Sequence, residues 1–433
     1  MSRPNASRRD FLKTTALAGA GYWIAGTSRA ADSTSPSEKV RFACIGVGGK
    51  GDSDTKDAGS HGDVVAICDI DEFALTKAGA AFPTARRFND FRKMFDEMGP
   101  SIDAVTVSTA DHAHAVISAQ AMRMGKHCFT QKPLTHTISE ARTLSKIAKE
   151  TGVVTQMGNQ GTANSGLRKS AAMIRAGMLG PVHEIHVWTN RPIWPQGGPA
   201  PKPVKPPKHV HWDLWLGPAA QREYAPGFHP FAWRGFWEFG TGALGDMGCH
   251  TMNMPFMALD LRNPVAIEAQ TSGHNKITYP KWSIIKYEFA ATDSRPAVTL
   301  TWYDGGKRPP QSLLSGQKVA ESGSLVIGEK GKLYSPADYV QEYVVLGGAS
   351  EPKVEFRESP GHFTEWVQEI KGGSPAVSNF ADYGGPLTEM VLLGNLAVWA
   401  GRKIHWDAES MKSPDAADLE PLIKTEYRAG YSI

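Results

Sequence analysis

A glycine-rich turn directly after an apolar segment constrains the fold of this chain more than any other feature. The segment 40–45 reads Val-Arg-Phe-Ala-Cys-Ile, which is typical of a buried strand. Glycines follow at GxGxxG spacing; they are Gly46, Gly48, Gly49 and Gly51. Glycines here allow a tight turn and let the backbone approach a phosphate at the N-terminus of the next helix. Because glycine turns are common, a dinucleotide site needs further support.

An acidic residue at the end of the next predicted strand gives that support. Asp69 follows the apolar run 64–68 and stands 18 residues after Gly51. Its carboxylate can accept hydrogen bonds from ribose hydroxyls and would repel a 2′-phosphate, so the pattern favours NAD over NADP. Asp71 is a second candidate for this role, but Asp69 lies directly at the strand end.

Apolar runs and helical patterns alternate through the first part of the chain. Further strands are predicted at 104–107, 127–129 and 153–156, and the clearest helix is predicted at 140–151. Buried strands that alternate with helices indicate a parallel sheet covered on both faces. We therefore predict an α/β fold whose first unit, residues 39–158, is a Rossmann domain that binds NAD.

The pattern changes after about Asn159. Residues 192–207 are rich in proline and glycine and are predicted to form a long loop. Beyond this loop the pattern predicts a large, mostly antiparallel open sheet with strands at 266–271, 282–289, 297–303 and 323–327, and helices near 363–371 and 387–400. Residues 159–433 are thus predicted to form an α/β domain that binds substrate and carries catalytic residues.

Residues 1–30 carry the pattern of an export signal. Arg8-Arg9 form a twin-arginine motif, the apolar stretch 14–26 follows, and small residues allow cleavage after Ala30. The apolar stretch is shorter than the roughly 20 residues of a membrane-spanning helix. We predict export to the periplasm or beyond by the Tat machinery, with a short linker at 31–38. An uncleaved leader that tethers the protein to the membrane is the alternative.

Charge and cysteine usage exclude several classes of function. The leader holds five of the 47 basic residues and one of the 44 acidic ones, so the remaining chain is close to neutral. A neutral chain does not favour nucleic acid or an anionic membrane as partner. The four cysteines show no zinc-type spacing, and no metal site is predicted. Cys44 and Cys68 lie in apolar runs, where buried free thiols are expected.

A lysine follows the predicted strand 127–129 and supplies the first catalytic candidate. Lys132 would lie at the carboxyl end of a parallel strand, where ligands bind in open sheets, although an isolated lysine is more often a surface residue. The chain resembles the Gfo/Idh/MocA oxidoreductases, named for glucose–fructose oxidoreductase and inositol dehydrogenase. The motifs that carry this resemblance are the glycine turn, Asp69, Thr109–His114, Gln131–Pro133 and Asp246–His250.

The resemblance implies catalytic roles for Lys132, Asp246 and His250. It also implies a Rossmann domain followed by an α/β domain with a large open sheet. The predicted cofactor contacts are Gly46, Gly48, Gly49, Gly51, Asp69, Thr109, His114 and Lys132. Two positions depart from the family pattern, since Gln131 replaces a usual glutamate and Ala110 a common proline. Neither change removes a group that handles protons.

The three catalytic candidates suit the oxidation of an alcohol. A hydride must leave carbon for nicotinamide while the hydroxyl proton is removed. His250 suits the base, and Asp246 would hold its ring. Lys132 would stabilise the developing alkoxide or take the proton itself, and both assignments remain open. The spacing of Asp246 and His250 puts them on one face of a helix, but glycines within 242–248 predict a looped segment.

Aromatic density indicates the kind of substrate. Six of the twelve tryptophans fall within residues 188–237, beside the predicted catalytic motif. Aromatic rings stack on the apolar faces of sugars, so a sugar or cyclitol is expected, although most of these rings are expected to pack the core or a homo-oligomer interface. Residues 190–192 are expected to shape the pocket rim. The candidate substrate-binding residues are Trp194, Tyr224, His229, Trp233, Arg234 and Asn253.

Three functions remain open. The first is an NAD-dependent oxidoreductase that acts on a secondary hydroxyl of a sugar, sugar derivative or cyclitol. The alternative is an NAD-dependent glycoside hydrolase, in which tightly bound NAD is reduced and restored within each cycle. Export favours a trapped cofactor, because free NAD is not expected to be replenished outside the cytoplasm. A non-catalytic nucleotide-binding protein is disfavoured, because all three proton-handling positions are filled. We favour the first, because no additional base stands out by motif.

Overall fold

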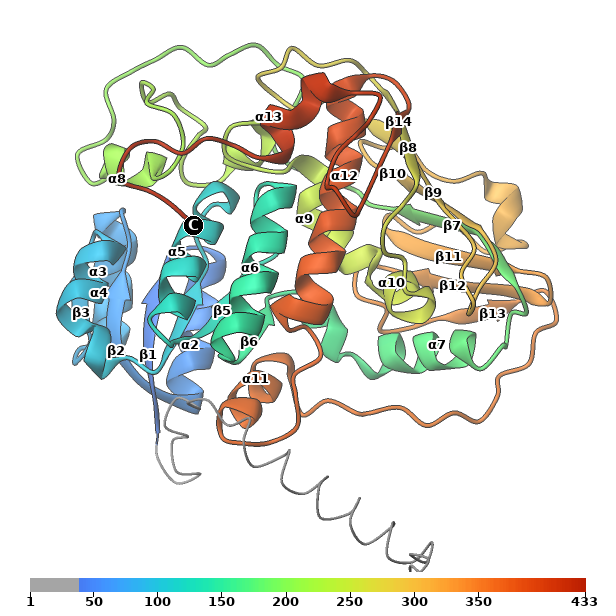
Figure 1. Ribbon diagram of the computed structural model, residues 1–433, viewed down its shortest axis with the longest axis horizontal. Coiled ribbons are helices and arrows are strands. Elements are labelled where there is room, and N and C mark those ends of the chain that lie inside the picture. The colour runs from blue at the N-terminus through green and yellow to red at the C-terminus, as the bar shows by residue number, and fades with distance from the viewer. Residues whose placement is uncertain (1–38) are drawn as a thin grey trace, which may run out of the picture.

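The first part of the chain forms a six-stranded parallel sheet in the order β3-β2-β1-β4-β5-β6 (Figure 1). The computed structural model describes residues 39–433, so the leader predicted at 1–30 and the linker at 31–38 lie outside the described residues. This strand order is that of dinucleotide-binding sheets, and the predicted parallel sheet is confirmed. The strands are β1 Val40–Ile45, β2 Gly62–Cys68, β3 Arg86–Phe88, β4 Ala104–Val107, β5 His127–Thr130 and β6 Thr155–Met157.

Helices return the chain to the same end of this sheet between successive strands. The helix α6 shows why they form where they do. The Thr137 side chain accepts a hydrogen bond from the Glu140 N–H, and the Glu140 carboxylate accepts one from the Thr137 N–H, which is a capping box. The left-handed Gly152, at φ +66°, ends the helix. The helices are α2 Lys50–His61, α3 Glu72–Ala81, α4 Phe91–Met98, α5 Asp111–Arg123 and α6 Ile138–Thr151, with a short 3-10 turn, η1 Gly99–Ser101.

The second part is built on an eight-stranded sheet in the order β13-β12-β11-β7-β10-β9-β8-β14. Every neighbouring pair is antiparallel except β7 and β10, which run parallel, so the prediction of a mostly antiparallel open sheet is confirmed. The strands are β7 Val182–Trp188, β8 Ala266–Thr271, β9 Ser283–Phe289, β10 Val298–Tyr303, β11 Gly323–Gly328, β12 Gly331–Pro336, β13 Val344–Leu346 and β14 Ile404–His405.

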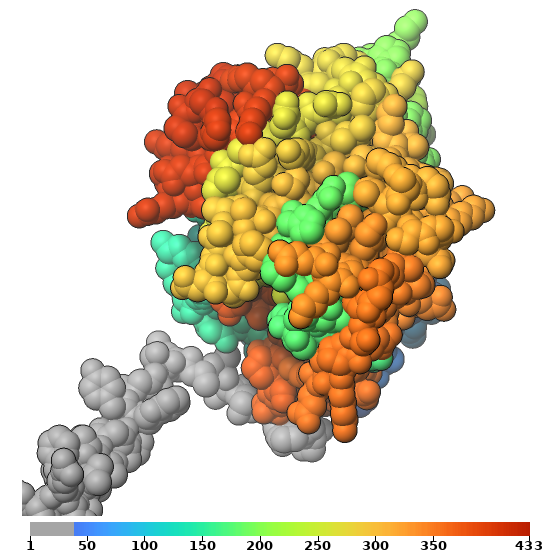
Figure 2. All heavy atoms as spheres, turned by 90° about the vertical axis from the view of Figure 1, so that its right-hand side faces the viewer, coloured from blue at the N-terminus to red at the C-terminus, as the bar shows by residue number. Residues whose placement is uncertain are grey.

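Two helices of the second part, α9 and α12, lie between the two sheets (Figure 1). Seen from the side of the eight-stranded sheet, the green segment that holds α7 and β7 lies between yellow and orange segments (Figure 2). None of the helices in residues 39–433 is long and apolar enough to cross a membrane. The α-helices are α7 Ser165–Arg175, α8 Trp212–Leu216, α9 Gly242–Thr251, α10 Asn253–Leu259, α11 His362–Ile370, α12 Gly385–Ala400 and α13 Glu420–Ile423. The shorter turns are η2 Gln160–Ala163, η3 Ala232–Gly235, η4 Gln311–Leu314, η5 Phe380–Gly384, which is a π-helix, and η6 Ala417–Leu419.

The last third of the chain ties the two parts together. The helix α12 packs against α6 of the first part and against α9 and β8 of the second. Phe363 and Trp366 of α11 pack on Phe42 of β1 and Phe129 of β5. A helix from the end of the chain therefore covers one face of the first sheet, so the two parts are held in one relative position.

Candidate active site

A cavity of about 770 Å³ extends from the glycine turn after β1 to helix α9. The turn lies at the carboxyl end of the parallel sheet, where ligands bind in folds of this kind. The cavity brings together residues that lie far apart in the sequence. Its lining includes Gly46, Gly48, Asp69, Thr109, His114, Lys132, Asp246 and His250.

The glycine turn has the geometry of a phosphate cradle. Gly46 lies at φ +76°, and a Cβ atom there would come within 2.7 Å of the backbone carbonyl carbon and oxygen of Ser108. A Cβ atom on Gly51 would lie 1.7 Å from the Gly46 oxygen. At Gly49, the N-cap of α2, nothing lies within 4 Å of a Cβ position and no side chain caps the helix. The open N-terminus of α2 thus fits the pyrophosphate of a dinucleotide.

Asp69, at the end of β2, stabilises this turn by hydrogen bonds to its backbone. Its Oδ2 accepts hydrogen bonds from the N–H groups of Val47, at 2.8 Å, and Gly48, at 3.2 Å. Its Oδ1 accepts one from the N–H of Asp71, at 2.9 Å. Burial raises the pKa of the Asp69 carboxyl, and the backbone donors partly offset this effect. The side chain lines the cavity, and its contact with a ribose stays a prediction.

His114 positions a loop of the cavity wall. Its Nδ1 lies 2.9 Å from the carbonyl oxygen of Pro133, and its Nε2 lies 3.1 Å from that of Thr109. The ring is buried and spans the segments after β4 and β5, so it fixes the loop that carries Lys132. Burial lowers the pKa of His114. Its contacts in the structure are with protein backbone, and a cofactor contact stays a prediction.

Asp246 and His250 lie on a helix, which corrects the prediction of a looped segment. The helix α9 runs from Gly242 to Thr251; Gly242, at φ +66°, turns the chain into the helix, and Gly245 and Gly248 lie within it at close contacts. A Cβ atom on Gly245 would lie 1.8 Å from Thr241 Oγ1, and one on Gly248 would lie 2.9 Å from Val391. Gly245 thus makes room for the Thr241 side chain of its own helix, and Gly248 lets α9 pack closely against Val391 of α12.

Lys132 and Asp246 form an ion pair across the cavity. Lys132 Nζ donates to Asp246 Oδ1 at 2.8 Å and to the main-chain oxygen of Asp246 at 2.6 Å. Both side chains are largely buried, at 14% and 12% exposure. Burial alone would raise the pKa of Asp246, but the charges of Lys132 and Arg234 outweigh it and lower the pKa to about 2. The carboxylate is therefore ionised and keeps the ammonium in place.

His250 lines the same cavity but is not held by Asp246 as predicted, because the Asp246 carboxylate turns to Lys132 instead. Its Nδ1 is buried and has no hydrogen-bond partner within the described part of the chain. The ring meets Tyr339 edge to face, with centroids 4.8 Å apart. Burial lowers the pKa of His250 well below its ordinary value, and the charge of Lys132 lowers it further. The imidazole is thus neutral.

Two arginines from the second part reach the same carboxylate. Arg191 Nε lies 3.5 Å from Asp246 Oδ2, and Arg234 Nε lies 3.5 Å from Asp246 Oδ1. The sequence predicts that Arg234 binds substrate hydroxyls and that Arg191 shapes the pocket rim, and in the structure both guanidinium groups face Asp246. No local sequence signal indicates that Arg191 reaches Asp246, because the contact depends on how the loop after β7 folds back.

Three of the predicted substrate-binding residues do not line the cavity. The Trp194 indole N–H donates to Gln196 instead, at 2.9 Å. Tyr224 packs edge to face on Trp212 at 5.1 Å. Asn253 is fully buried, and its Nδ2 donates to Thr162 Oγ1 at 2.7 Å. Their side chains are engaged in packing and internal hydrogen bonds, so the structure gives no support to these three as substrate contacts in this cavity.

The other three candidates do line the cavity. His229 Nε2 lies 2.8 Å from Asp71 Oδ2, next to the end of β2. Trp233 lies under the guanidinium of Arg234, with 4.1 Å from the Arg234 Cζ to the ring centroid. Of the six tryptophans in 188–237, only Trp215 and Trp233 line this cavity. The others pack elsewhere, as expected for most of the group.

The contacts of Gln131 explain why this chain carries glutamine where the family pattern has glutamate. Its Nε2 donates to Asp54 Oδ2 at 2.8 Å, and Ser108 Oγ donates to the same oxygen at 2.7 Å. Lys50 Nζ pairs with the other oxygen of Asp54, at 2.5 Å. A glutamate at position 131 would face the Asp54 carboxylate, and two buried like charges would repel each other. The amide therefore suits a chain that carries Asp54 on α2.

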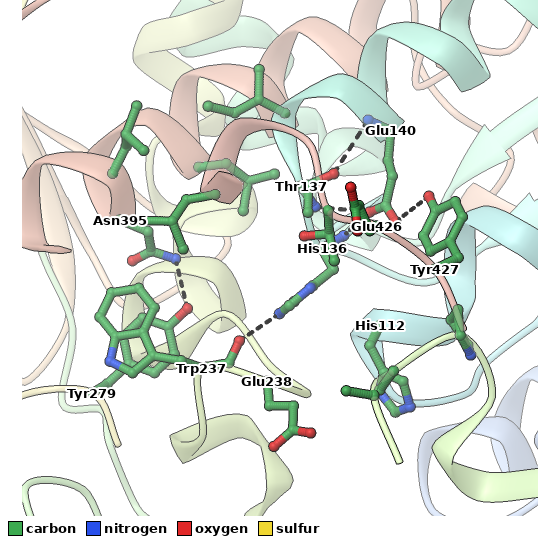
Figure 3. Close-up of a pocket in the computed structure, with 18 residues that line it drawn as sticks. His112, His136, Thr137, Glu140, Trp237, Glu238, Tyr279, Asn395, Glu426 and Tyr427 are labelled. Atoms are coloured by element: carbon green, nitrogen blue, oxygen red, sulfur yellow. Dashed lines mark hydrogen bonds between the residues drawn. The ribbon is translucent and has the colours of Figure 1, made fainter. Parts of the chain in front are cut away.

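A second cavity of about 220 Å³ lies beneath the C-terminal segment (Figure 3). Several of its polar side chains are held by hydrogen bonds. Tyr427 O–H donates to Glu140 Oε1 at 2.7 Å, and His136 Nε2 lies 3.0 Å from the Trp237 oxygen. Asn395 Nδ2 lies 3.5 Å from the Tyr279 hydroxyl oxygen. The candidate catalytic residues Lys132, Asp246 and His250 do not line this cavity. Among residues 39–433, no cluster of His, Cys, Asp and Glu is arranged to hold a metal ion.

The fold and this site define an oxidoreductase with a dinucleotide-binding sheet and a separate sheet that closes the site. The family model for an oxidoreductase NAD-binding Rossmann fold matches residues 40–159, and the model for the C-terminal alpha/beta domain matches residues 173–433. The chain belongs to the Gfo/Idh/MocA family, which confirms the predicted family. NAD is the cofactor of its first part, as predicted.

Similar curated proteins match only segments of the chain. The uncharacterized oxidoreductase YdgJ of Escherichia coli is 31% identical over 149 residues, 33% of this chain and 42% of that protein. A glycosyl hydrolase family 109 protein of Solibacter usitatus is 32% identical over 161 residues, 34% of this chain and 37% of that protein. The scyllo-inositol 2-dehydrogenase (NAD(+)) of Bacillus subtilis is 35% identical over 81 residues, 19% of this chain and 24% of that protein. The matched segments thus span less than half of each relative.

Solved structures share the fold over most of the chain. The WlbA dehydrogenase of Bordetella pertussis, in complex with NADH and UDP-GlcNAcA, superposes with a TM-score of 0.62 at 18% identity. The match covers 86% of this chain and 99% of that one. The aldose-aldose oxidoreductase of Caulobacter crescentus, complexed with glycerol, gives a TM-score of 0.58 at 18% identity. This match covers 85% of this chain and 100% of that one. At such identities the likeness shows the fold.

Proposed function

We propose that this protein oxidises a secondary hydroxyl group of a sugar, a sugar derivative or a cyclitol. The observation that carries the proposal is the Lys132–Asp246 ion pair, which stands with His250 in the cavity that holds the glycine turn. NAD held at that turn by Gly46, Gly48 and Gly51 would supply the acceptor for a hydride from the carbinol carbon. Dehydrogenases of sugars and cyclitols among the similar proteins support this class of substrate.

His250, Lys132 and Asp246 have different roles in removing the hydroxyl proton. His250, which lines the cavity and is neutral because burial lowers its pKa, is the side chain that accepts the hydroxyl proton in this proposal. The Lys132 ammonium stabilises the negative charge that develops on the oxygen. Asp246 holds the ammonium through two hydrogen bonds and thereby sets where that charge can form.

A glycoside hydrolase is the second candidate function. Glycosyl hydrolase family 109 proteins of three bacteria are among the similar sequences, at 28–32% identity. Such a hydrolase first oxidises a hydroxyl group of the glycoside to a ketone, which acidifies the neighbouring C–H bond. The aglycone is then eliminated, water adds to the double bond, and the ketone is reduced again. The cofactor ends each cycle in its starting state.

Export is a further part of the proposal. The twin-arginine motif at Arg8-Arg9 and the cleavage pattern at Ala30 support passage through the Tat machinery in a folded state. A protein that leaves the cytoplasm folded can carry its NAD with it. We expect purified protein to release NAD on denaturation, in about one equivalent per chain, detected by enzymatic assay of the supernatant. A cofactor-free preparation that binds added NAD only weakly would contradict the trapped cofactor.

One experiment separates the two candidate functions. The protein is incubated with a panel of free sugars, cyclitols and nitrophenyl glycosides, and both reduced nicotinamide and released nitrophenol are followed. Reduced nicotinamide with a free sugar or cyclitol supports the oxidoreductase. Nitrophenol release with no net reduction supports the hydrolase and contradicts the simple dehydrogenase. Neither signal from any compound would contradict both.

A further inference from the structure

We propose that the substrate carries an anionic group, a carboxylate or a phosphate, that is bound by Arg191 and Arg234. This inference deepens the proposed function and rests on it for the position of the substrate. The two guanidinium groups enter the cavity from the loop after β7 and from η3, and both come within 3.5 Å of the catalytic carboxylate of Asp246.

The charges at this place do not balance within the protein. Lys132, Arg191 and Arg234 all lie within 4.0 Å of one carboxylate, that of Asp246. The imidazole of His250 is neutral, because burial lowers its pKa, so it adds no charge. Three cations therefore face one anion in a partly buried site. Burying unpaired charge costs free energy, and an anionic ligand would relieve that cost.

The other carboxylates that line the cavity are engaged with different partners. Asp69 accepts backbone N–H groups, Asp71 faces His229, and Asp90 pairs with Arg92. Asp111 accepts a hydrogen bond from Thr241 Oγ1 at 2.6 Å. Lys50, the remaining cation near the catalytic end, already pairs with Asp54. None of these groups neutralises the two arginines.

The arginines are also held in a fixed orientation. The Arg234 guanidinium lies over the ring of Trp233 at 4.1 Å, and its Nη1 donates to the main-chain oxygen of Phe231 at 3.4 Å. Arg191 bonds to the side chain of Asn190, and its side chain is 23% exposed, as is that of Arg234. A planar guanidinium matches the two oxygens of a carboxylate or phosphate.

The cofactor phosphates do not account for this pair. The pyrophosphate of a dinucleotide belongs at the N-terminus of α2, beside Gly49, where Lys50 is the nearest cation in sequence. Arg191 and Arg234 instead contact Asp246 on α9 in the second part of the chain. A sugar acid or a sugar phosphate that presents its hydroxyl to His250 would place its anionic group within their reach.

The test measures binding and turnover with matched pairs of compounds on the NAD-saturated protein. The probes are D-glucuronate against D-glucose, D-galacturonate against D-galactose, and D-glucose 6-phosphate. Calorimetry gives the affinity of each, and reduced nicotinamide gives its turnover. We expect at least one acidic compound to bind about 10- to 100-fold more tightly than its neutral counterpart, as expected for hydrogen bonds to a charged group. The uronates and the sugar phosphate distinguish the two sources of the anion.

Variants then tie the preference to the arginines. Arg234→Gln and Arg191→Gln should each reduce the ratio of acidic to neutral affinity by about 10-fold or more, with NAD affinity within about 3-fold of the parent protein. Arg402→Gln removes an exposed guanidinium that pairs with Asp418, and it should leave the ratio unchanged. Equal losses for acidic and neutral compounds would show that the arginines only position Asp246, and would overturn the proposal.

Failure of this inference and failure of the proposed function give different results. Turnover of neutral compounds with no affinity gained by any acidic one overturns the anionic substrate and leaves the oxidoreductase standing. Preferential binding of an acidic compound that reduces no cofactor supports the anion site and contradicts the proposed reaction.

Discussion

Lys132 is the residue on which the proposed chemistry depends most directly. Its ammonium donates both to the carboxylate and to the main-chain oxygen of Asp246, so two contacts fix it in the cavity. A cation held in advance stabilises developing negative charge without reorganising during the reaction. Asp246 is ionised at neutral pH, since neighbouring positive charge lowers its pKa to about 2 despite burial.

Lys132→Met should remove this stabilisation and keep the length of the side chain. We expect kcat/KM for the oxidised substrate to fall by about 10²- to 10³-fold, because one group that stabilises the oxyanion is lost. The measurement is steady-state or single-turnover reduction of nicotinamide. The matched control is Lys307→Met, since Lys307 lies over Trp282 outside the cavity lining. Activity of Lys132→Met equal to that of the control would remove the lysine from the mechanism.

The pH dependence tests His250 as the proton acceptor. Burial and the charge of Lys132 lower its pKa well below 6.5, so the ring stays deprotonated as the pH falls through that value. We expect kcat/KM to fall by less than about 3-fold from about pH 7.5 to about pH 5.5, whereas an unshifted histidine would lose about 10-fold. An acidic limb centred near 6.5 would contradict the shifted histidine.

Residue roles could be predicted from the sequence only where a motif fixed them. The set of Lys132, Asp246 and His250 follows from the resemblance, and the structure places all three in one cavity. The contact of Arg191 with Asp246 was missed, because nothing local in a sequence tells which loop folds back onto which helix. Trp194 and Tyr224 were chosen by type, yet their rings are used up in packing.

At the scale of elements, strand and helix bounds were predicted well where the residues are apolar. The predicted strand 40–45 and β1 coincide, as do 104–107 and β4. The short strand β3 was missed, because Arg86-Arg87-Phe88 is largely exposed at the sheet edge and carries no apolar pattern. The helix α9 was predicted as a loop, because its glycines signal turns unless the close packing that needs them is known.

The turn between β1 and α2 offers a test at the same scale. A Cβ atom on Gly51 would lie 1.7 Å from the Gly46 oxygen, which is backbone and cannot move aside. Gly51→Ala should therefore distort the turn, lower NAD affinity by about 10-fold or more and lower the free energy of unfolding by about 1–3 kcal/mol. Titration calorimetry and urea unfolding measure the two effects.

A matched glycine gives the control for this change. Gly198 has no atom within 4 Å of a Cβ position and lies outside the cavity lining. Gly198→Ala should change the free energy of unfolding by less than about 0.5 kcal/mol. If Gly51→Ala bound NAD as tightly as this control, the turn would not be the cofactor cradle.

For the whole molecule, the sequence predicted two units but not how they are joined. The predicted division at residues 158 and 159 follows from a change of pattern along the chain. The packing of α11 on β1 and β5 could not be seen in that pattern, because an amphipathic helix shows that it has a buried face but not which sheet covers it. The relative position of the two parts, and with it the cavity, depends on such distant contacts.

A buried ion pair belongs to this joining surface. Arg168 of α7 and Glu365 of α11 lie 2.7 Å apart, with side-chain exposures of 4% and 0%. Arg168 also donates to the backbone oxygens of Thr162, at 2.7 Å, and Arg357, at 3.0 Å. The Arg168 guanidinium thus contacts α11, η2 and the segment that holds Arg357, and so links these three segments to its own helix α7. Its positive charge is balanced by Glu365.

Glu365→Ala should therefore destabilise the whole protein. It leaves the Arg168 guanidinium buried without its counter-charge, which typically costs about 3–5 kcal/mol. Urea or thermal unfolding of the NAD-bound protein measures the loss, and Glu365→Gln should lose less because the amide oxygen still accepts a hydrogen bond. Glu288→Ala, which breaks the exposed pair with Lys403, should cost less than about 1 kcal/mol. Equal losses for Glu365→Ala and Glu288→Ala would mean that the buried pair does not hold α7 and α11 together, and that apolar packing alone fixes the two parts around the cavity.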